Sequence, residues 1–306
     1  MNIEALNQQY GIKDVAQFLQ EEDGLIFLSI NNSFASARIT LFGAQILSFK
    51  PTGTQDVLWV SDNANFKEGK AIRGGIPVCF PWFGPHQTDN TKPQHGFART
   101  SNWHVLAIQQ LADGATDIQL MLEQSKKTLD LWPFPFKAVI NFIVGNSLQV
   151  IFNVTNTGTT SFQYSDALHT YFNISDIAAI ELDGFDNSPY FEAFGNELLQ
   201  QKHITLNQGI ENNRRYVHHP GEAIITDPGF NRKINIKKTG SKVTVVWNPG
   251  PVTSKKFADM RPDGYKNFIC IEPANAYPGI DMVYLAPGED FSLSTTIKID
   301  RLGAGI

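Results

Sequence analysis

Residues 168–175, LHTYFNIS, place one histidine inside an apolar run typical of a β-strand. The ordinary pKa of an imidazole is about 6.5, so His169 could take up and release protons near neutral pH. A single histidine in such a strand is also often a structural residue of the core, because the surroundings decide its role. A proton-transfer role therefore needs a second titratable group from elsewhere in the chain.

The irregular segment 71–99 gathers residues that could bind a sugar or a phosphate. Its prolines and glycines favour tight bends and close backbone approach. Aromatic faces can stack on a pyranose, and guanidinium groups bind hydroxyl or phosphate oxygens as a fork. The same composition fits a crossover that closes one end of a sandwich, with its arginines in solvent. The candidate side chains are Arg73, Trp82, Phe83, His86, His95 and Arg99.

Short apolar or alternating runs, separated by turn residues, dominate the rest of the chain. Such runs, without helical patterns between them, favour antiparallel strands over a βαβ fold. The sequence therefore predicts an all-β protein, built as a large antiparallel β-sandwich. The expected strands are 24–30, 36–42, 44–50, 56–61, 117–123, 136–144, 147–157, 162–175, 178–184, 242–250, 267–273 and 289–300.

The N-terminal region differs from the rest in its pattern. Apolar residues within 3–20 have spacings that suit one or two short amphipathic helices, which end before Gly24. No linker, composition shift or internal repeat divides the chain. We expect a single domain over 1–306, with residues 1–23 as a helical extension.

Composition limits the possible partners. The chain has 306 residues and a formal net charge of -5, so it has no general attraction for nucleic acid or anionic membranes. It has no basic-then-apolar leader and no apolar run of transmembrane length. Cys79 and Cys270 lie in apolar strings and are expected to be buried free thiols. These features predict a cytoplasmic location as the default; they do not determine the oligomeric state, for which a monomer is the default expectation.

Five stretches in one order resemble a known family: IRGGIPVCFPWFG, QHGFAR, LHTYFN, VVWNPGP and DGYKNFICIEPANA. Together they resemble the hexose-6-phosphate mutarotases, or glucose-6-phosphate 1-epimerases, of the galactose-mutarotase-like superfamily, over residues 24–300. The resemblance implies a twisted sandwich with an open groove, no metal and no organic cofactor. It also implies interconversion of the α and β anomers of an aldohexose 6-phosphate, chiefly glucose 6-phosphate.

The resemblance assigns roles to individual residues. It implies that His169 is the general acid and Glu272 the general base. Ring opening needs an acid at the ring oxygen and a base at the anomeric hydroxyl. We therefore expect these two side chains in one groove, on opposite sides of the reacting atoms and about a pyranose width apart. Arg73, Gln94 and Arg99 resemble substrate-binding residues of the family.

Three further residues are weaker candidates. Asn213 stands where many relatives carry an aspartate that contacts the sugar, and an amide keeps hydrogen bonding but loses the charge. His95 could donate a hydrogen bond to the sugar. Trp247 ends an apolar strand and could be a sugar-stacking wall or part of the core.

Other chemistries have less support in the sequence. The histidines and cysteines show no metal-ligand spacing, and there is no phosphate-binding loop or dinucleotide fingerprint. A retaining glycosidase needs two close carboxylates, and nothing pairs the available ones. Two alternatives remain open: a carbohydrate-binding or sensor protein without turnover, and an aldose 1-epimerase for unphosphorylated sugars. The unpaired carboxylates are Asp166, Asp176, Glu181 and Asp183.

Overall fold

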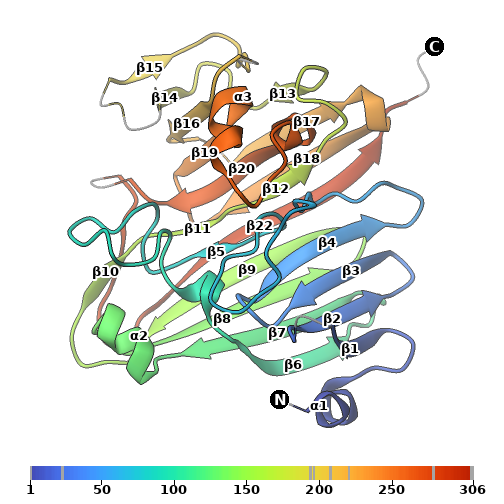
Figure 1. Ribbon diagram of the computed structural model, residues 1–306, viewed down its shortest axis with the longest axis vertical. Coiled ribbons are helices and arrows are strands. Elements are labelled where there is room, and N and C mark those ends of the chain that lie inside the picture. Colours follow the sequence, from blue (N-terminus) through green and yellow to red (C-terminus); the bar gives the residue numbers. More distant parts are fainter. Residues whose placement is uncertain are drawn as a thin grey trace.

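The structure is a computed structural model that describes residues 2–21, 24–192, 195, 197–206, 209–219, 221–277 and 280–303. Antiparallel strands are the dominant regular structure, and the helices are short (Figure 1). The predicted all-β antiparallel architecture is confirmed. In the described part of the chain, no helix is long and apolar enough to cross a membrane. The helices are α1 (Ile3–Tyr10), α2 (Lys126–Leu131) and α3 (Gly250–Thr253).

Two eight-stranded sheets form the main body, and all strand pairings between described residues are antiparallel. The first sheet has the order β15 (Leu199–Gln200), β14 (Pro189–Glu192), β16 (Asn212–Val217), β19 (Val243–Asn248), β20 (Phe268–Asn275), β11 (Asp166–Leu168), β5 (Val78–Cys79), and β12 (Tyr171–Asn173) also pairs with β20. The second has the order β13 (Glu181–Asp183), β17 (Glu222–Asp227), β18 (Arg232–Thr239), β22 (Asp290–Arg301), β9 (Ser147–Asn156), β8 (Phe136–Val144), β7 (Thr116–Glu123), β6 (His104–Gln110).

Two smaller sheets complete the fold. One has four strands, β1 (Ala16–Gln20), β2 (Ile26–Asn31), β3 (Ala35–Thr40) and β4 (Gln45–Pro51), and the other pairs β10 (Phe162–Tyr164) with β21 (Val283–Leu285).

Burial along the strands follows the side-chain alternation of a sheet. In β8 every second residue is buried and the others are half-buried, so one face packs on the core. In β20 every residue is buried, which shows that both faces of this central strand are covered. Glu272 lies on β20, so its carboxyl is held in a part of the protein that has little access to water.

The expected helical extension over residues 1–23 is wrong beyond α1. The helix begins after Asn2, whose side chain accepts hydrogen bonds from the first turn, and it ends at Tyr10. Ala16–Gln20 forms β1, in which Ala16 and Phe18 are buried and the other residues are exposed. This two-residue period, together with pairing to β2, fixes a strand where the apolar spacing suggested a helix. Residues 22–23 lie outside the described part of the chain.

The irregular segment 71–99 joins the first sheet through β5, and a close backbone contact within the segment folds it back on itself. Gly96 has φ +73°, and a Cβ there would lie 2.0 Å from the carbonyl oxygen of Phe80. Only glycine allows the two backbones to approach this closely. The contact fixes the stretch that carries Gln94, His95 and Arg99.

We expect Gly96→Ala to lower the free energy of unfolding by about 3 kcal/mol or more, since it adds a clash to an unfavourable φ. Gly84→Ala is the matched control, because Gly84 has φ +76° and nothing within 4 Å of its Cβ position. The control should lose only about 1 kcal/mol. Guanidinium unfolding followed by tryptophan fluorescence measures both, and equal losses would contradict the close-approach explanation.

Candidate active site

One cavity of about 350 Å³ lies over the first sheet and is lined by all eight residues that the sequence assigned to catalysis or substrate binding, whereas Trp82 and His86 of segment 71–99 do not line it. This volume suits a small ligand. The structure therefore brings these residues together, while their roles stay predictions. They are Arg73, Gln94, His95, Arg99, His169, Asn213, Trp247 and Glu272.

Strand register explains why side chains far apart in sequence share this cavity. Asn213 on β16 pairs with Trp247 on β19, which in turn pairs with Cys270 on β20. Directly paired residues of a sheet point to the same face. Glu272, two residues beyond Cys270, therefore faces the same side as Trp247 and Asn213.

His169 occupies a break in the strand that the sequence predicted over 162–175. β11 ends at Leu168 and β12 begins at Tyr171. The backbone N–H of His169 donates to the carbonyl of Pro77 at 3.0 Å. Its ring stacks on Tyr171, with centroids 4.8 Å apart and planes at 10°, and meets the edge of Trp247. These contacts fix the orientation of the imidazole.

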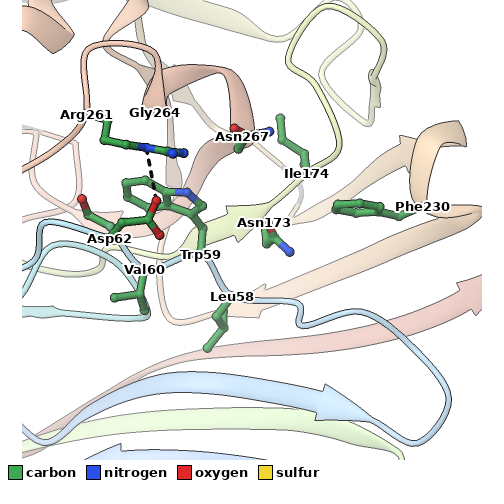
Figure 2. A pocket seen from close by; sticks show the side chains of 11 residues that line it. Leu58, Trp59, Val60, Asp62, Asn173, Ile174, Phe230, Arg261, Gly264 and Asn267 are labelled. Atoms are coloured by element: carbon green, nitrogen blue, oxygen red, sulfur yellow. Dashed lines mark ion pairs between the residues drawn. The ribbon is translucent and has the colours of Figure 1, made fainter.

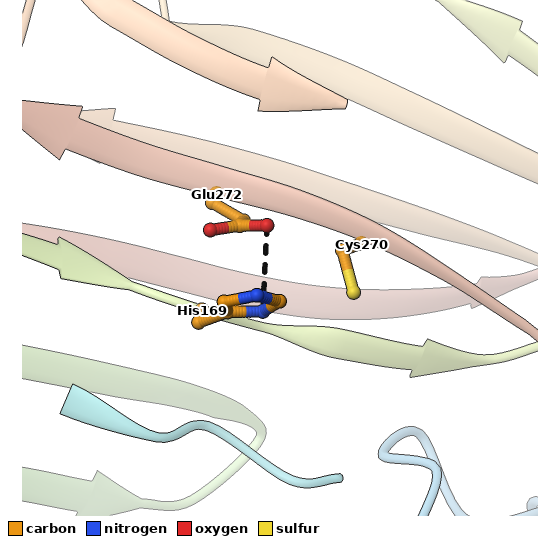
Figure 3. A group of neighbouring side chains, drawn as sticks. All are labelled: His169, Cys270 and Glu272. Atoms are coloured by element: carbon orange, nitrogen blue, oxygen red, sulfur yellow. Dashed lines mark ion pairs between the residues drawn. The ribbon is translucent and has the colours of Figure 1, made fainter. Parts of the chain in front are cut away.

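His169 and Glu272 lie next to one another, as Figure 3 shows. Nδ1 of His169 is 3.3 Å from Oε1 of Glu272, and both side chains are buried. The expected separation of about a pyranose width is therefore wrong. The reason is that the β11–β12 break directly neighbours β20, so the two side chains enter the cavity from adjacent backbones.

Burial governs the protonation of this pair. It lowers the pKa of the His169 imidazole, and the charges of Arg99 and Arg73 lower that pKa further. Burial also raises the pKa of the Glu272 carboxyl well above its usual range, although Arg99 opposes the rise. The two shifts favour a neutral imidazole beside a protonated carboxyl. This state has the same number of protons as an imidazolium beside a carboxylate, so the pair holds one proton that either group can carry.

The pair also retains unused hydrogen-bonding capacity. Nδ1 of His169 lies 3.3 Å from Oε1 of Glu272 without the geometry of a hydrogen bond, and Oε2 of Glu272 is buried with no hydrogen-bond partner among the described residues. Buried polar atoms without partners are costly, and such atoms in a cavity indicate a ligand that satisfies them. The pair can exchange a proton with two neighbouring atoms of a bound molecule.

Two of the predicted arginines differ in how their charge is compensated. Nε of Arg73 donates to Asp259 at 2.8 Å, and its guanidinium lies 4.1 Å from the centre of the Phe257 ring. Arg99 donates from Nη2 to the carbonyl of Gln94 at 2.7 Å, and its Nε is buried without a partner among the described residues. Arg99 is therefore the better placed of the two to receive an anionic ligand.

His95 is oriented by the irregular segment. The backbone N–H of Gly84 donates to its Nδ1 at 3.1 Å. Burial lowers the pKa of His95 well below its usual range, with a further contribution from Arg99. A neutral ring that accepts at Nδ1 carries its proton on Nε2, so His95 can donate a hydrogen bond from that atom.

Glu211 lines the cavity and was missed by sequence reasoning. Its Oε1 accepts hydrogen bonds from Nε1 of Trp247 at 2.9 Å and from Nδ2 of Asn213 at 3.3 Å. Trp247 is thus both a wall of the cavity and a hydrogen-bonded residue. The charge absent at Asn213 is supplied two positions earlier in the stretch ENNRRY. Glu211 and Asn213 are two residues apart, as residues on one face of a strand are, and this spacing could have indicated Glu211 from the sequence.

Arg215 also lines the cavity and was not predicted from the sequence. It lies two residues after Asn213 on β16, so the same alternation would have found it.

Figure 2 shows a second cavity, of about 320 Å³, which none of the predicted site residues line. It lies beside Trp59, whose ring stacks on Tyr171. Arg261 forms an ion pair with Asp62 there at 3.2 Å. The residues that line it include no histidine, so they offer no counterpart of the His169–Glu272 pair.

The described residues include one group that could in principle hold a metal ion. Ligand atoms of His169, Cys270 and Glu272 lie within 4.8 Å of one another. Burial raises the pKa of the Cys270 thiol well above its usual range, which keeps it in the protonated form that binds metals weakly. Cys79 and Cys270 are both free and buried, as predicted.

Comparison with known proteins agrees with this fold. The profile of the family described as "Aldose 1-epimerase" matches residues 27–298. A relative from Escherichia coli (strain K12), named "Putative glucose-6-phosphate 1-epimerase", is 37% identical over 259 residues, which cover 83% of this chain and 84% of the relative. A relative of the same name from Salmonella typhimurium (strain LT2) is 34% identical with the same coverage.

Solved structures extend the likeness to nearly the whole chain. The crystal structure of a "putative mutarotase" from Salmonella typhimurium has a TM-score of 0.86 and 30% identity, and the match covers 95% of this chain and 96% of that one. A "Putative aldose 1-epimerase" from Escherichia coli K12 has a TM-score of 0.72 at 17% identity, which shows the shared fold. The resemblance predicted from the five sequence stretches is confirmed, and the chain belongs to the aldose 1-epimerase family.

Proposed function

We propose that this protein is a glucose-6-phosphate 1-epimerase, an isomerase that interconverts the α and β anomers of hexose 6-phosphates. One observation carries the proposal. A buried His169–Glu272 pair with one proton opens into a cavity of sugar size that is also lined by arginines. The two relatives described above carry the name of this activity.

The adjacent placement of the pair suits the reaction better than the separation expected from the sequence. The two atoms that exchange protons, the anomeric O1 and the ring oxygen O5, are bonded to the same carbon, C1. Two groups in contact can therefore reach both atoms from one side of the ring. A pair that spanned the sugar could not reach both so directly.

Ring opening moves one proton in each direction. In the reactive form, Glu272 is the carboxylate that takes the proton from the O1 hydroxyl, and the His169 imidazolium gives its proton to O5. The C1–O5 bond breaks as O1 becomes the aldehyde oxygen, so charge balances without any other reactant. The pair is left as protonated carboxyl and neutral imidazole, which is the form that burial favours.

Reclosure reverses the two roles. The C1–C2 bond of the open-chain aldehyde rotates and presents the other face of the carbonyl to the O5 hydroxyl. His169 then removes the O5 proton while Glu272 returns its proton to O1. The pair regains its starting form and the opposite anomer leaves. One shared proton thus serves both half-reactions.

Other cavity residues hold the sugar in place for this exchange. The protein carries a net charge of -5, so a dianionic phosphate must be bound by local cations. Nε of Arg99 is buried without a partner among the residues that the structure describes, whereas Arg73 is already paired with Asp259. We therefore assign Arg99 to an anionic group and Arg73, Gln94 and His95 to hydroxyls. The two buried free cysteines fit a reducing compartment, and we place the reaction in the cytoplasm.

The proposal is tested with freshly dissolved α-glucose 6-phosphate and α-glucose, followed in parallel by polarimetry or NMR exchange, with the uncatalysed rates subtracted. Wild type should accelerate the phosphorylated sugar more. We expect Arg99→Lys to lower kcat/KM for glucose 6-phosphate by at least about tenfold, consistent with loss of a charge-assisted fork of about 1.5–3 kcal/mol. Exchange of glucose should change much less. Equal losses on both sugars would show that Arg99 binds hydroxyls.

The alternatives give different results in the same assay. A binding protein without turnover would leave both exchange rates at the uncatalysed value, and an epimerase for unphosphorylated sugars would favour glucose. None of the four carboxylates considered for a glycosidase lines the cavity.

A further inference from the structure

Arg215 and Glu272 share one row of the first sheet. Arg215 on β16 pairs with Val245 on β19, and Val245 pairs with Glu272 on β20. Paired side chains point to the same face, so Arg215 and Glu272 face the cavity together. Two strand spacings separate them, which is about 10 Å.

The charge of Arg215 has no acidic partner among the described residues. Its neighbour Arg214, on the opposite face of β16, pairs with Glu192 at 2.8 Å, and Arg73 pairs with Asp259. Arg215 instead donates from Nη2 to the carbonyl of Gly195 at 3.3 Å, and its Nε is buried without a partner in the described part of the chain. A half-buried cation with free donors is costly unless an anion arrives to pair with it.

Two aromatic rings fix the guanidinium in place. Arg215 lies 4.9 Å from the centre of the Tyr277 ring and 6.0 Å from that of Phe191. These rings stack on each other with centroids 4.8 Å apart. Aromatic faces favour a planar cation and leave its in-plane donors free. The side chain is therefore oriented before any ligand binds.

We propose that Arg215 binds the 6-phosphate of the substrate while C1 lies at the His169–Glu272 pair. This inference rests on the proposed function and adds Arg215 to Arg99 as a second arginine that binds the one anionic group of the substrate. A planar fork with unpaired donors matches two phosphate oxygens. The backbones of Arg215 and Glu272 are separated by two strand spacings, about 10 Å, which is comparable to the length of a hexose 6-phosphate.

Arg215→Lys tests the proposal, because it keeps the positive charge and removes the fork. We expect KM for glucose 6-phosphate to rise at least tenfold and glucose exchange to keep its rate. Inorganic phosphate is the second probe: it should inhibit glucose exchange by wild type competitively, and its inhibition constant should rise at least tenfold in Arg215→Lys. Arg214→Lys is the matched control, since it makes the same change at the adjacent residue on the opposite face, and it should alter neither constant.

The outcomes separate this inference from the proposed function. Equal losses on both sugars, or an unchanged inhibition constant for phosphate, would overturn the role of Arg215. If wild type exchanges only glucose, the proposed function fails, and phosphate inhibition of that reaction still decides whether Arg215 is an anion site. If wild type exchanges neither sugar, calorimetry of phosphate binding to wild type and to Arg215→Lys decides it, and equal affinities would overturn the assignment.

Discussion

Glu272→Gln is expected to lower kcat/KM for glucose 6-phosphate by at least about 10²-fold. An amide of the same shape cannot take the proton from the O1 hydroxyl, and a positioned proton-transfer group typically contributes 10²–10⁴-fold. Substrate binding should change less, because the amide still fills the space and can hydrogen-bond the sugar. Polarimetric exchange of α-glucose 6-phosphate measures the loss. Near wild-type kcat in this variant would mean that another group is the base.

A stability measurement distinguishes a loss of proton transfer from a loss of folding. The folded-state pKa of Glu272 is raised by burial, so between about pH 4.5 and that raised pKa the folded protein binds one proton that the unfolded chain has released. The contribution of Glu272 to stability therefore falls as pH rises through this window. Within this pH window we expect the free energy of unfolding of Glu272→Gln, relative to that of wild type, to rise by up to about 1.4 kcal/mol per pH unit.

Much of the site could be predicted because its residues lie in short stretches of unusual composition. The Pro- and Gly-rich segment 71–99 shows in the sequence that it is no ordinary strand, and it contains four of the eight predicted cavity residues. His169 and Glu272 are 103 residues apart, and their pairing was inferred from resemblance. Nothing local in the sequence shows that the β11–β12 break lies beside β20, so their 3.3 Å contact could not be predicted.

The strands missed from the sequence show a second limit. β6, β16 and β18 carry polar or charged residues at many positions, so their alternation is weak. They form because neighbouring strands supply hydrogen-bonding partners, which is a tertiary effect that overrides local propensity. Missing β16 also hid Arg215, whose position relative to Glu272 depends on the register of three strands.

His169→Gln is expected to lower kcat by about 10²-fold or more. It should also reverse the direction in which kcat changes with pH on the alkaline side. In wild type the active form carries one proton on the pair. Activity should fall in acid, where a second proton adds with the lowered pKa of His169, and fall in alkali, where the proton leaves with the raised pKa of Glu272. In His169→Gln only Glu272 titrates, and it must be ionised to act as a base. The remaining activity should therefore rise with pH through the raised pKa of Glu272, where that of wild type falls.

His95→Gln is the control for this experiment. His95 lines the same cavity with its ring 5.6 Å from that of His169, and we assign it to hydrogen bonding without proton transfer. It should lower the rate by a smaller factor and keep the bell-shaped profile of wild type. The measurement is kcat for glucose 6-phosphate exchange across the pH range in which the protein stays folded. A bell-shaped profile in His169→Gln would show that the proton delivered to O5 comes from another residue, and a rising profile in His95→Gln would transfer the acid role to His95.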